Sequence, residues 1–100
     1  MIDWAKIAGF DWDHGNSAKN LTSHQVDRAE AEQIFANQPL LLSADSMHSR
    51  SESRFQALGK SNSGRLLFAA FTLRQGDSLI RIISVRDMNR KERVQYAEAP

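Results

Sequence analysis

Two arginines near the end of one predicted strand could bind the phosphate groups of a nucleic acid. Arg81 lies within the β-branched run from Ile80 to Val85, and Arg86 follows that run directly. Strict alternation along a pleated strand places Arg81 and Val85 on one face and Arg86 on the other, so the two guanidinium groups need not point the same way. A guanidinium fork matches two phosphate oxygens. The pattern therefore predicts half of an anion-binding site.

A short cationic helix is predicted directly after these arginines. Asn89 is a favoured N-cap, and Glu92 stands at the third helical position, as in a capping box. The helix would show Val94 and Tyr96 to the sheet, and its N-terminal amides could add donors for an anion. The alternative is that the two arginines are solvated, or paired with Asp87 and Glu92.

Size and composition favour one small domain spanning residues 1–100. Apolar residues make up 41% of the 100 residues, and cysteine is absent, which removes disulfides and thiolate zinc sites. No histidine and carboxylate cluster has metal-ligand spacing, so no metal or other cofactor is expected. The apolar run Leu66 to Phe71 is too short to span a membrane, and the acidic amino terminus is unlike a secretion signal. A prokaryotic cytoplasmic protein is expected.

The charges are distributed unevenly along the chain. Residues 1–48 hold 3 basic and 7 acidic residues, whereas residues 49–100 hold 10 basic and 5 acidic residues. This asymmetry favours an acidic partner or nucleic acid for the second half, provided that folding does not interleave the charges.

The elements that must position these residues follow from periodicity and turn signals. Asp27, with Glu30 three residues later, predicts the clearest helix, with Ala31, Ile34 and Phe35 as its apolar stripe. We also expect short edge strands at 2–4 and 10–13, a turn at 14–16, a helix at 17–23, a buried strand at 40–42, a polar loop at 43–53, and strands at 54–58, 65–73 and 79–85. The predicted fold is α+β, a two-layer arrangement in which an antiparallel sheet of about four strands packs with three helices.

The order and spacing of several motifs resemble one family over residues 10 to 96. They are FDWD at 10–13, Lys19-Asn20, Ser23-His24, the helix from Asp27 to Phe35, Glu52-x-Arg54, Gly59, Gly64-Arg65-Leu66-Leu67, IRIISVR at 80–86, Arg90-Lys91-Glu92-Arg93 and Tyr96. Together they resemble the BrnT toxins, also catalogued as a domain of unknown function.

The resemblance implies a fold similar to the RelE and ParE toxins and a role as the toxin of a type II toxin-antitoxin pair. It also implies ribonuclease activity that halts translation. The expected partner is a BrnA-like ribbon-helix-helix antitoxin, which forms a hetero-oligomer with the toxin. Operator DNA would be bound only through this antitoxin. A non-catalytic RNA- or DNA-binding or co-repressor role, and an inactive scaffold, are the alternatives. Ser23 and Asp87 stand where the family usually has lysine, and residues 1–9 precede the usual start.

Metal-free RNA cleavage needs a base, cations that stabilise the phosphorane and an acid for the leaving oxygen. In this scheme Arg81 and Arg86 hold the scissile phosphate, and either His24 or Glu52 takes part in proton transfer. RNA binding is assigned to four further residues: Arg54, Arg90, Tyr96 and Trp12.

Each of these residues has a structural alternative. His24 could cap or pack between two short helices, and Glu52 could simply pair with Arg54. Trp12 could belong to the core rather than stack on a base, and Tyr96 could cover the sheet rather than assist at the site. Asp11 and Asp13 would repel RNA, so we expect them to cap the following turn or to face the antitoxin.

Overall fold

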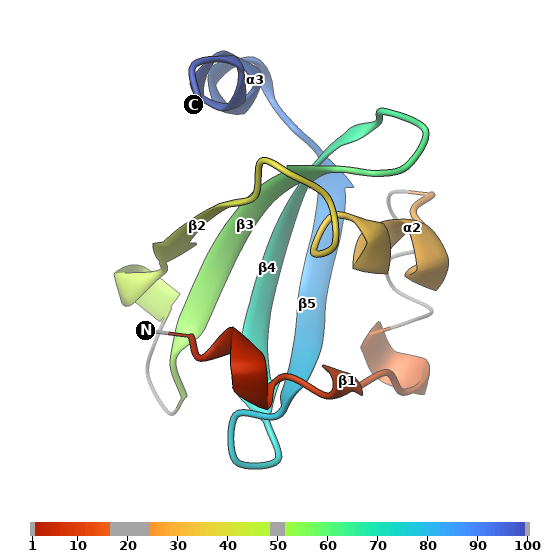
Figure 1. The fold of residues 1–100 in the computed structure, drawn as a ribbon, viewed down its shortest axis with the longest axis vertical. Coiled ribbons are helices and arrows are strands. Elements are labelled where there is room, and N and C mark those ends of the chain that lie inside the picture. Colours follow the sequence, from red (N-terminus) through yellow and green to blue (C-terminus); the bar gives the residue numbers. More distant parts are fainter. Residues whose placement is uncertain (1, 17–24, 49–51, 100) are drawn as a thin grey trace.

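The computed structural model describes residues 2–16, 25–48 and 52–99. Its α+β fold combines one mixed sheet with short helices, as predicted (Figure 1). Residues 14–16, predicted as a turn, are helical, and the helix predicted at 17–23 lies outside the described residues. In chain order the elements are η1 (Trp4–Lys6), β1 (Gly9–Phe10), α2 (Arg28–Gln33), β2 (Leu41–Ala44), η2 (Ser46–His48), β3 (Arg54–Lys60), β4 (Leu66–Arg74), β5 (Leu79–Asp87) and α3 (Arg90–Ala97).

The described strands form a sheet in the order β1-β5-β4-β3-β2, one strand more than predicted. Strands β2 to β5 pair antiparallel, which confirms the predicted meander, whereas β1 adds in parallel to the free edge of β5. The strand expected at 10–13 is only Gly9–Phe10, and the one expected at 2–4 is wrong because Asp3 caps the 3-10 turn η1 instead. Within the described residues, no helix is long and apolar enough to cross a membrane.

A β-bulge in β5 corrects the predicted faces of the two arginines. Phe71 pairs with Ile82 and the preceding Ala70 pairs with Ser84, so Ile83 is an extra residue without an opposite partner. The bulge reverses the alternation of side chains after Ile82. Val85 therefore points into the core, as Ile82 does, and both side chains are fully buried. Arg81 and Arg86 consequently share the opposite face of the sheet, where strict alternation had separated them.

Helix α2 covers the core face of the sheet. Its N-cap Asp27 accepts a hydrogen bond from the Glu30 amide at 2.8 Å, as predicted, and Ala31 and Ile34 are fully buried. A Cβ built on Gly59 of β3 would lie 2.9 Å from the Ile34 Cβ, so glycine at this position permits the close approach of helix and strand. The core of the domain lies between α2 and β3 to β5.

Strand β2 is an exposed edge rather than the buried strand predicted at 40–42. Leu41 is half-buried and Leu42 is 39% exposed, and the described residues place no further strand beside β2. A polar loop is predicted at 43–53, but residues 43 and 44 belong to β2 and residues 46–48 form η2.

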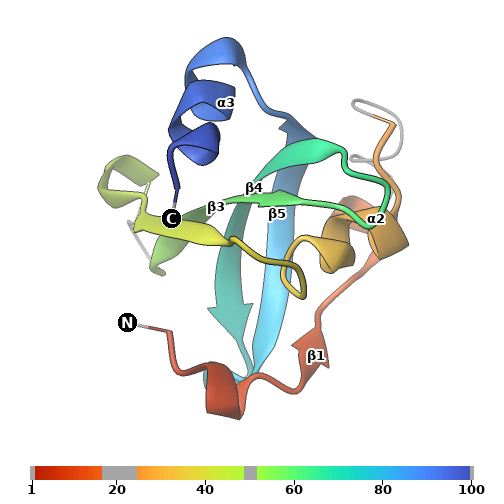
Figure 2. The same ribbon diagram turned by 45° about the horizontal axis from the view of Figure 1, so that its top comes forward.

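Helix α3 stands beyond the end of the sheet at which β5 finishes (Figures 1 and 2). Asn89 and Glu92 form the predicted capping box. Tyr96 faces a second apolar cluster with Leu58 and Met88, as predicted, but Val94 is 55% exposed and faces away from it. The helix therefore turns its Tyr96 side to the sheet, and the prediction that Val94 also faces the sheet is wrong.

Candidate functional site

The face opposite the core carries both arginines of β5, and we call it the arginine face. Its residues lie in three cross-strand rows, each running from β3 through β4 to β5. The rows are Arg54, Thr72 and Arg81; Gln56, Ala70 and Ser84; and Leu58, Phe68 and Arg86. The register thus brings Arg54 and Arg81 into one row, separated by two strand spacings of about 5 Å each.

Arg81 is held by two carboxylates that follow β1. Its guanidinium lies 3.0 Å from Asp13 and 3.7 Å from Asp11, and its side chain is 18% exposed. The hydrogen bond from Arg81 lowers the pKa of Asp13 below its ordinary value, with a further contribution from the Asn16 amide. Asp13 therefore caps the segment at 14–16, which is helical rather than the predicted turn, and it also neutralises Arg81.

Arg86 lies over the Phe68 ring, 4.1 Å from its centroid, and forms a two-bond ion pair with Glu92 of α3. The Nη1 and Nη2 atoms lie 2.8 and 3.0 Å from the two carboxylate oxygens. Burial raises the pKa of Glu92, but the Arg86 hydrogen bonds, the Asn89 amide and the Arg86 charge outweigh it and leave the pKa lowered. Glu92 thus caps its helix and fixes Arg86 at the same time.

The two arginines present separate anion contacts. Their cross-strand partners, Phe68 and Thr72, are four residue steps apart in β4, which is about 13 Å along the strand. Arg81 turns toward the residues after β1, and Arg86 turns toward α3. Their arrangement suits two separate phosphates of an extended anion better than one phosphate held by both arginines.

The remaining predicted residues are dispersed. Glu52 pairs with Arg74 at 3.2 Å, not with Arg54, and both side chains are 42% exposed. Arg90 is exposed at the start of α3, and His24 lies outside the described residues.

Both aromatic candidates have structural contacts. The Tyr96 hydroxyl donates to the Pro39 carbonyl at 2.6 Å, and the residue is only 8% exposed. The Trp12 indole donates to Glu32 at 2.7 Å, and its ring packs against the core. These contacts match the structural alternatives for the two side chains.

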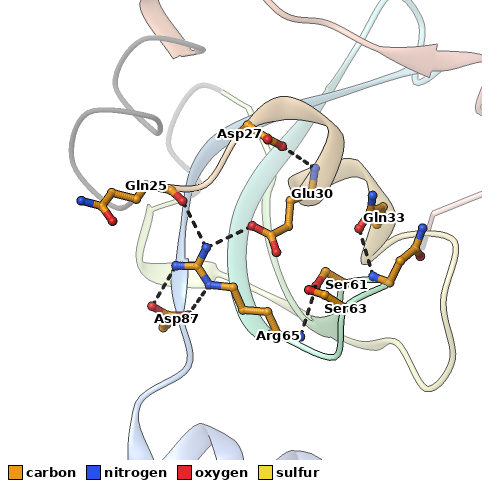
Figure 3. Close-up of polar contacts among 9 residues, drawn as sticks. Gln25, Asp27, Glu30, Gln33, Ser61, Ser63, Arg65 and Asp87 are labelled. Carbon is orange, nitrogen blue, oxygen red and sulfur yellow. Dashed lines mark hydrogen bonds and ion pairs between the residues drawn. The ribbon is translucent and has the colours of Figure 1, made fainter.

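Sequence reasoning gave no role to Arg65, which joins three segments (Figure 3). Its guanidinium donates to both Asp87 oxygens at 2.7 and 3.0 Å, to Glu30 at 3.0 Å and to the Gln25 carbonyl at 3.1 Å. The Asp87 hydrogen bonds hold the pKa of Arg65 above its ordinary value. The signal was present in the sequence as Gly64-Arg65 and the unexpected Asp87, but only the pairing of β4 with β5 brings them together.

A hollow of about 80 Å³ separates α3 from the arginine face. Leu58 and Phe68 form its apolar floor, while Gln56, Gln95 and Glu92 supply polar groups at its sides. Sequence reasoning missed this feature because its walls come from separate elements. In the part of the chain that the structure describes, no group of three or more histidine, cysteine or carboxylate residues could hold a metal ion.

Two comparisons relate the chain to known proteins. Residues 12–92 match the model of the family described as "Ribonuclease toxin, BrnT, of type II toxin-antitoxin system". The 1.1 Å crystal structure of the Brucella abortus ribonuclease toxin BrnT is similar, with a TM-score of 0.57 and 19% sequence identity, covering 82% of this chain and 97% of that chain. Among curated proteins, none matches.

Proposed function

Because the chain belongs to the BrnT family of ribonuclease toxins of type II toxin-antitoxin systems, we propose that it is a metal-independent endoribonuclease that inhibits translation. The observation that carries the proposal is the arginine face, on which the bulge in β5 directs Arg81 and Arg86 to the same side as Arg54. Three guanidinium groups on one rigid sheet suit an RNA backbone.

In the proposed reaction, a base removes the proton of the 2′-hydroxyl, and that oxygen attacks the adjacent phosphorus. The bond to the 5′-oxygen then breaks, an acid protonates this oxygen, and the other product ends in a 2′,3′-cyclic phosphate. Arg54 and Arg81 flank Thr72 in one row, so a phosphate above that row would meet a cation on each side. Arg86 would hold a neighbouring phosphate, whereas the sequence suggested that Arg81 and Arg86 hold the same scissile phosphate.

The ion pair between Arg81 and Asp13 does not prevent this role. The Asp13 side chain is 55% exposed, so it regains water easily when a phosphate replaces it at Arg81. Proton transfer is assigned to Glu52 or His24. Glu52 precedes Arg54 by two residues at the start of β3, close in sequence to the Arg54 row.

The test is incubation of the purified, antitoxin-free protein with end-labelled RNA in chelator. Cleavage that leaves 2′,3′-cyclic phosphate, and that is lost in the Arg81→Ala/Arg86→Ala double variant, is expected. Lys60→Ala, which removes an exposed cation at the end of β3, is the matched control and should cut normally. Glu52→Gln and His24→Gln then test the two candidates for proton transfer, because only one of them should abolish cleavage. A folded double variant that cuts RNA fully would contradict the proposal.

A non-catalytic RNA- or DNA-binding or co-repressor role is the second candidate. It is favoured by the exposed cations Arg90 and Lys91 at the start of α3, which could bind a phosphate backbone without taking part in cleavage. RNA that binds with strong salt dependence yet stays intact, also when ribosomes are added, would favour this candidate.

We further propose that a ribbon-helix-helix antitoxin neutralises the protein in the cytoplasm and supplies all contacts to operator DNA. Support comes from the family, whose description names a toxin-antitoxin system. Coexpression of the neighbouring genes should yield a hetero-oligomer, and the isolated toxin should not bind operator DNA. A toxin that purifies alone from that coexpression would contradict the proposed partner.

A further inference from the structure

The hollow between α3 and the arginine face has the composition of a ligand site. Its floor is apolar, formed by Leu58, which is 7% exposed, and the half-buried ring of Phe68. Its polar lining includes the Gln56 and Gln95 side chains, from β3 and α3. Small-molecule sites typically combine apolar walls with a few polar groups that fix orientation.

The two glutamines are available to a ligand. Neither side chain forms a hydrogen bond with any residue that the structure describes, although Gln56 is half-buried on the sheet. Each amide presents a donor and an acceptor side by side. A planar group with adjacent acceptor and donor atoms, such as the edge of a nucleobase, complements them.

The hollow also adjoins an anion contact. Glu92 and Phe68 line it, and both touch Arg86, whose guanidinium lies over the Phe68 ring. A phosphate at Arg86 would therefore place an attached sugar and base beside the hollow. Single-stranded RNA is commonly recognised in this way, with a base splayed out, stacked on an aromatic or arginine plane and hydrogen-bonded at its edge.

We propose that this hollow is a nucleobase subsite and that Gln56 and Gln95 determine which base lies next to the phosphate bound at Arg86. The inference rests on the proposed function, since RNA is the ligand that supplies both the phosphate and the base. Ser43, also in the lining, marks the β2 side of the subsite.

The first test requires no cleavage. The ¹⁵N-labelled protein is titrated with each of the four nucleoside 3′-monophosphates, and the side-chain amide signals of Gln56 and Gln95 are followed. One nucleotide should shift both signals saturably, whereas ribose 5-phosphate, which lacks a base, should leave them unchanged. Amide signals that do not move with any nucleotide, or that move equally with ribose 5-phosphate, would overturn the inference.

The second test measures base preference. With a randomised RNA, the ratio of kcat/KM between the preferred and the other bases at one position next to the cut should fall about tenfold in Gln56→Ala and in Gln95→Ala. Gln75→Gly is the matched control, because it removes an exposed amide from the β4–β5 turn at a φ of 56° that glycine accepts. An unchanged preference in both alanine variants, with melting curves showing that they are folded, would refute the subsite.

The two tests separate this inference from the proposed function. Selective nucleotide binding at the glutamines in a protein that cuts no RNA would retain the subsite and refute the endoribonuclease. Chelator-resistant cleavage with unaltered preference in Gln56→Ala and Gln95→Ala would retain the endoribonuclease and refute the subsite.

Discussion

Replacing Arg65 by alanine should destabilise the fold measurably, because this one side chain joins α2 to the ends of β4 and β5. The Asp87 carboxylate is 63% exposed, so its share should be below about 1 kcal/mol. The Glu30 bond is more sheltered, with side chains 29% and 23% exposed, and a charged hydrogen bond of that kind contributes about 1.5 kcal/mol. We therefore expect Arg65→Ala to lower the free energy of unfolding by about 2 kcal/mol.

Urea denaturation of Arg65→Ala, Asp87→Ala, Glu30→Ala and the two corresponding double variants provides the assay. The coupling energy of Arg65 with Glu30 should exceed its coupling energy with Asp87, and the latter should shrink further in high salt. Arg74→Ala is the matched control, since its pair with Glu52 is 42% exposed on both sides and should contribute less than about 1 kcal/mol.

A loss below about 0.5 kcal/mol in Arg65→Ala would refute this reasoning. So would a coupling energy that is larger for Asp87 than for Glu30, because exposure would then not be what limits the contribution of these ion pairs.

Three further predictions concern packing, pH and the buried tyrosine. Gly59→Ala should cost about 1–3 kcal/mol in a denaturant titration, since its Cβ would lie 2.9 Å from the Ile34 Cβ; an unchanged midpoint would show that α2 shifts freely. The pKa of Glu92 is lowered on folding, so its carboxylate stabilises the fold above the ordinary value of 4.5, and this contribution is lost as pH falls through the lowered pKa. Stability should therefore fall more steeply below pH 4.5 in the wild type than in Glu92→Gln, and parallel curves would contradict the assignment. Tyr96→Phe, which removes the 2.6 Å hydrogen bond to a backbone carbonyl, should cost about 1 kcal/mol yet leave kcat/KM for RNA unchanged; a selective loss of cleavage would instead place the hydroxyl in the site.

Features set by local sequence could be predicted, whereas those set by pairing between distant segments could not. The caps at Asp27 and Asn89 depend on side chains within three residues, and both are observed as predicted. The bulge at Ile83 depends on which β4 residues face it, so the sequence of β5 alone predicted the wrong face for Arg86. Helix α3 buries Tyr96 rather than Val94, and the Tyr96 hydroxyl donates to the Pro39 carbonyl, which lies 57 residues away in the chain.

The same distinction applies to the candidate site. Arginines suited to phosphate could be recognised from residue type, but their carboxylate partners could not. Arg81 meets Asp13 across 68 residues of chain, and Arg65 meets Asp87 across 22. The hollow beside Arg86 likewise requires α3 and three strands to be in place before its glutamines converge.

These long-range pairs also decide what the uneven charge distribution means. Acidic side chains of the first half neutralise basic ones of the second, as Asp13 does for Arg81 and Glu30 does for Arg65. The charges are therefore interleaved by folding, and the asymmetry along the chain overstates the positive field of the sheet. Exposed cations persist on α3, where Arg90 and Lys91 lie at the start of the helix. Electrostatic attraction of RNA should thus be strongest at the α3 end, which is the end that holds Arg86 and the hollow, and bound RNA would reach Arg81 from there.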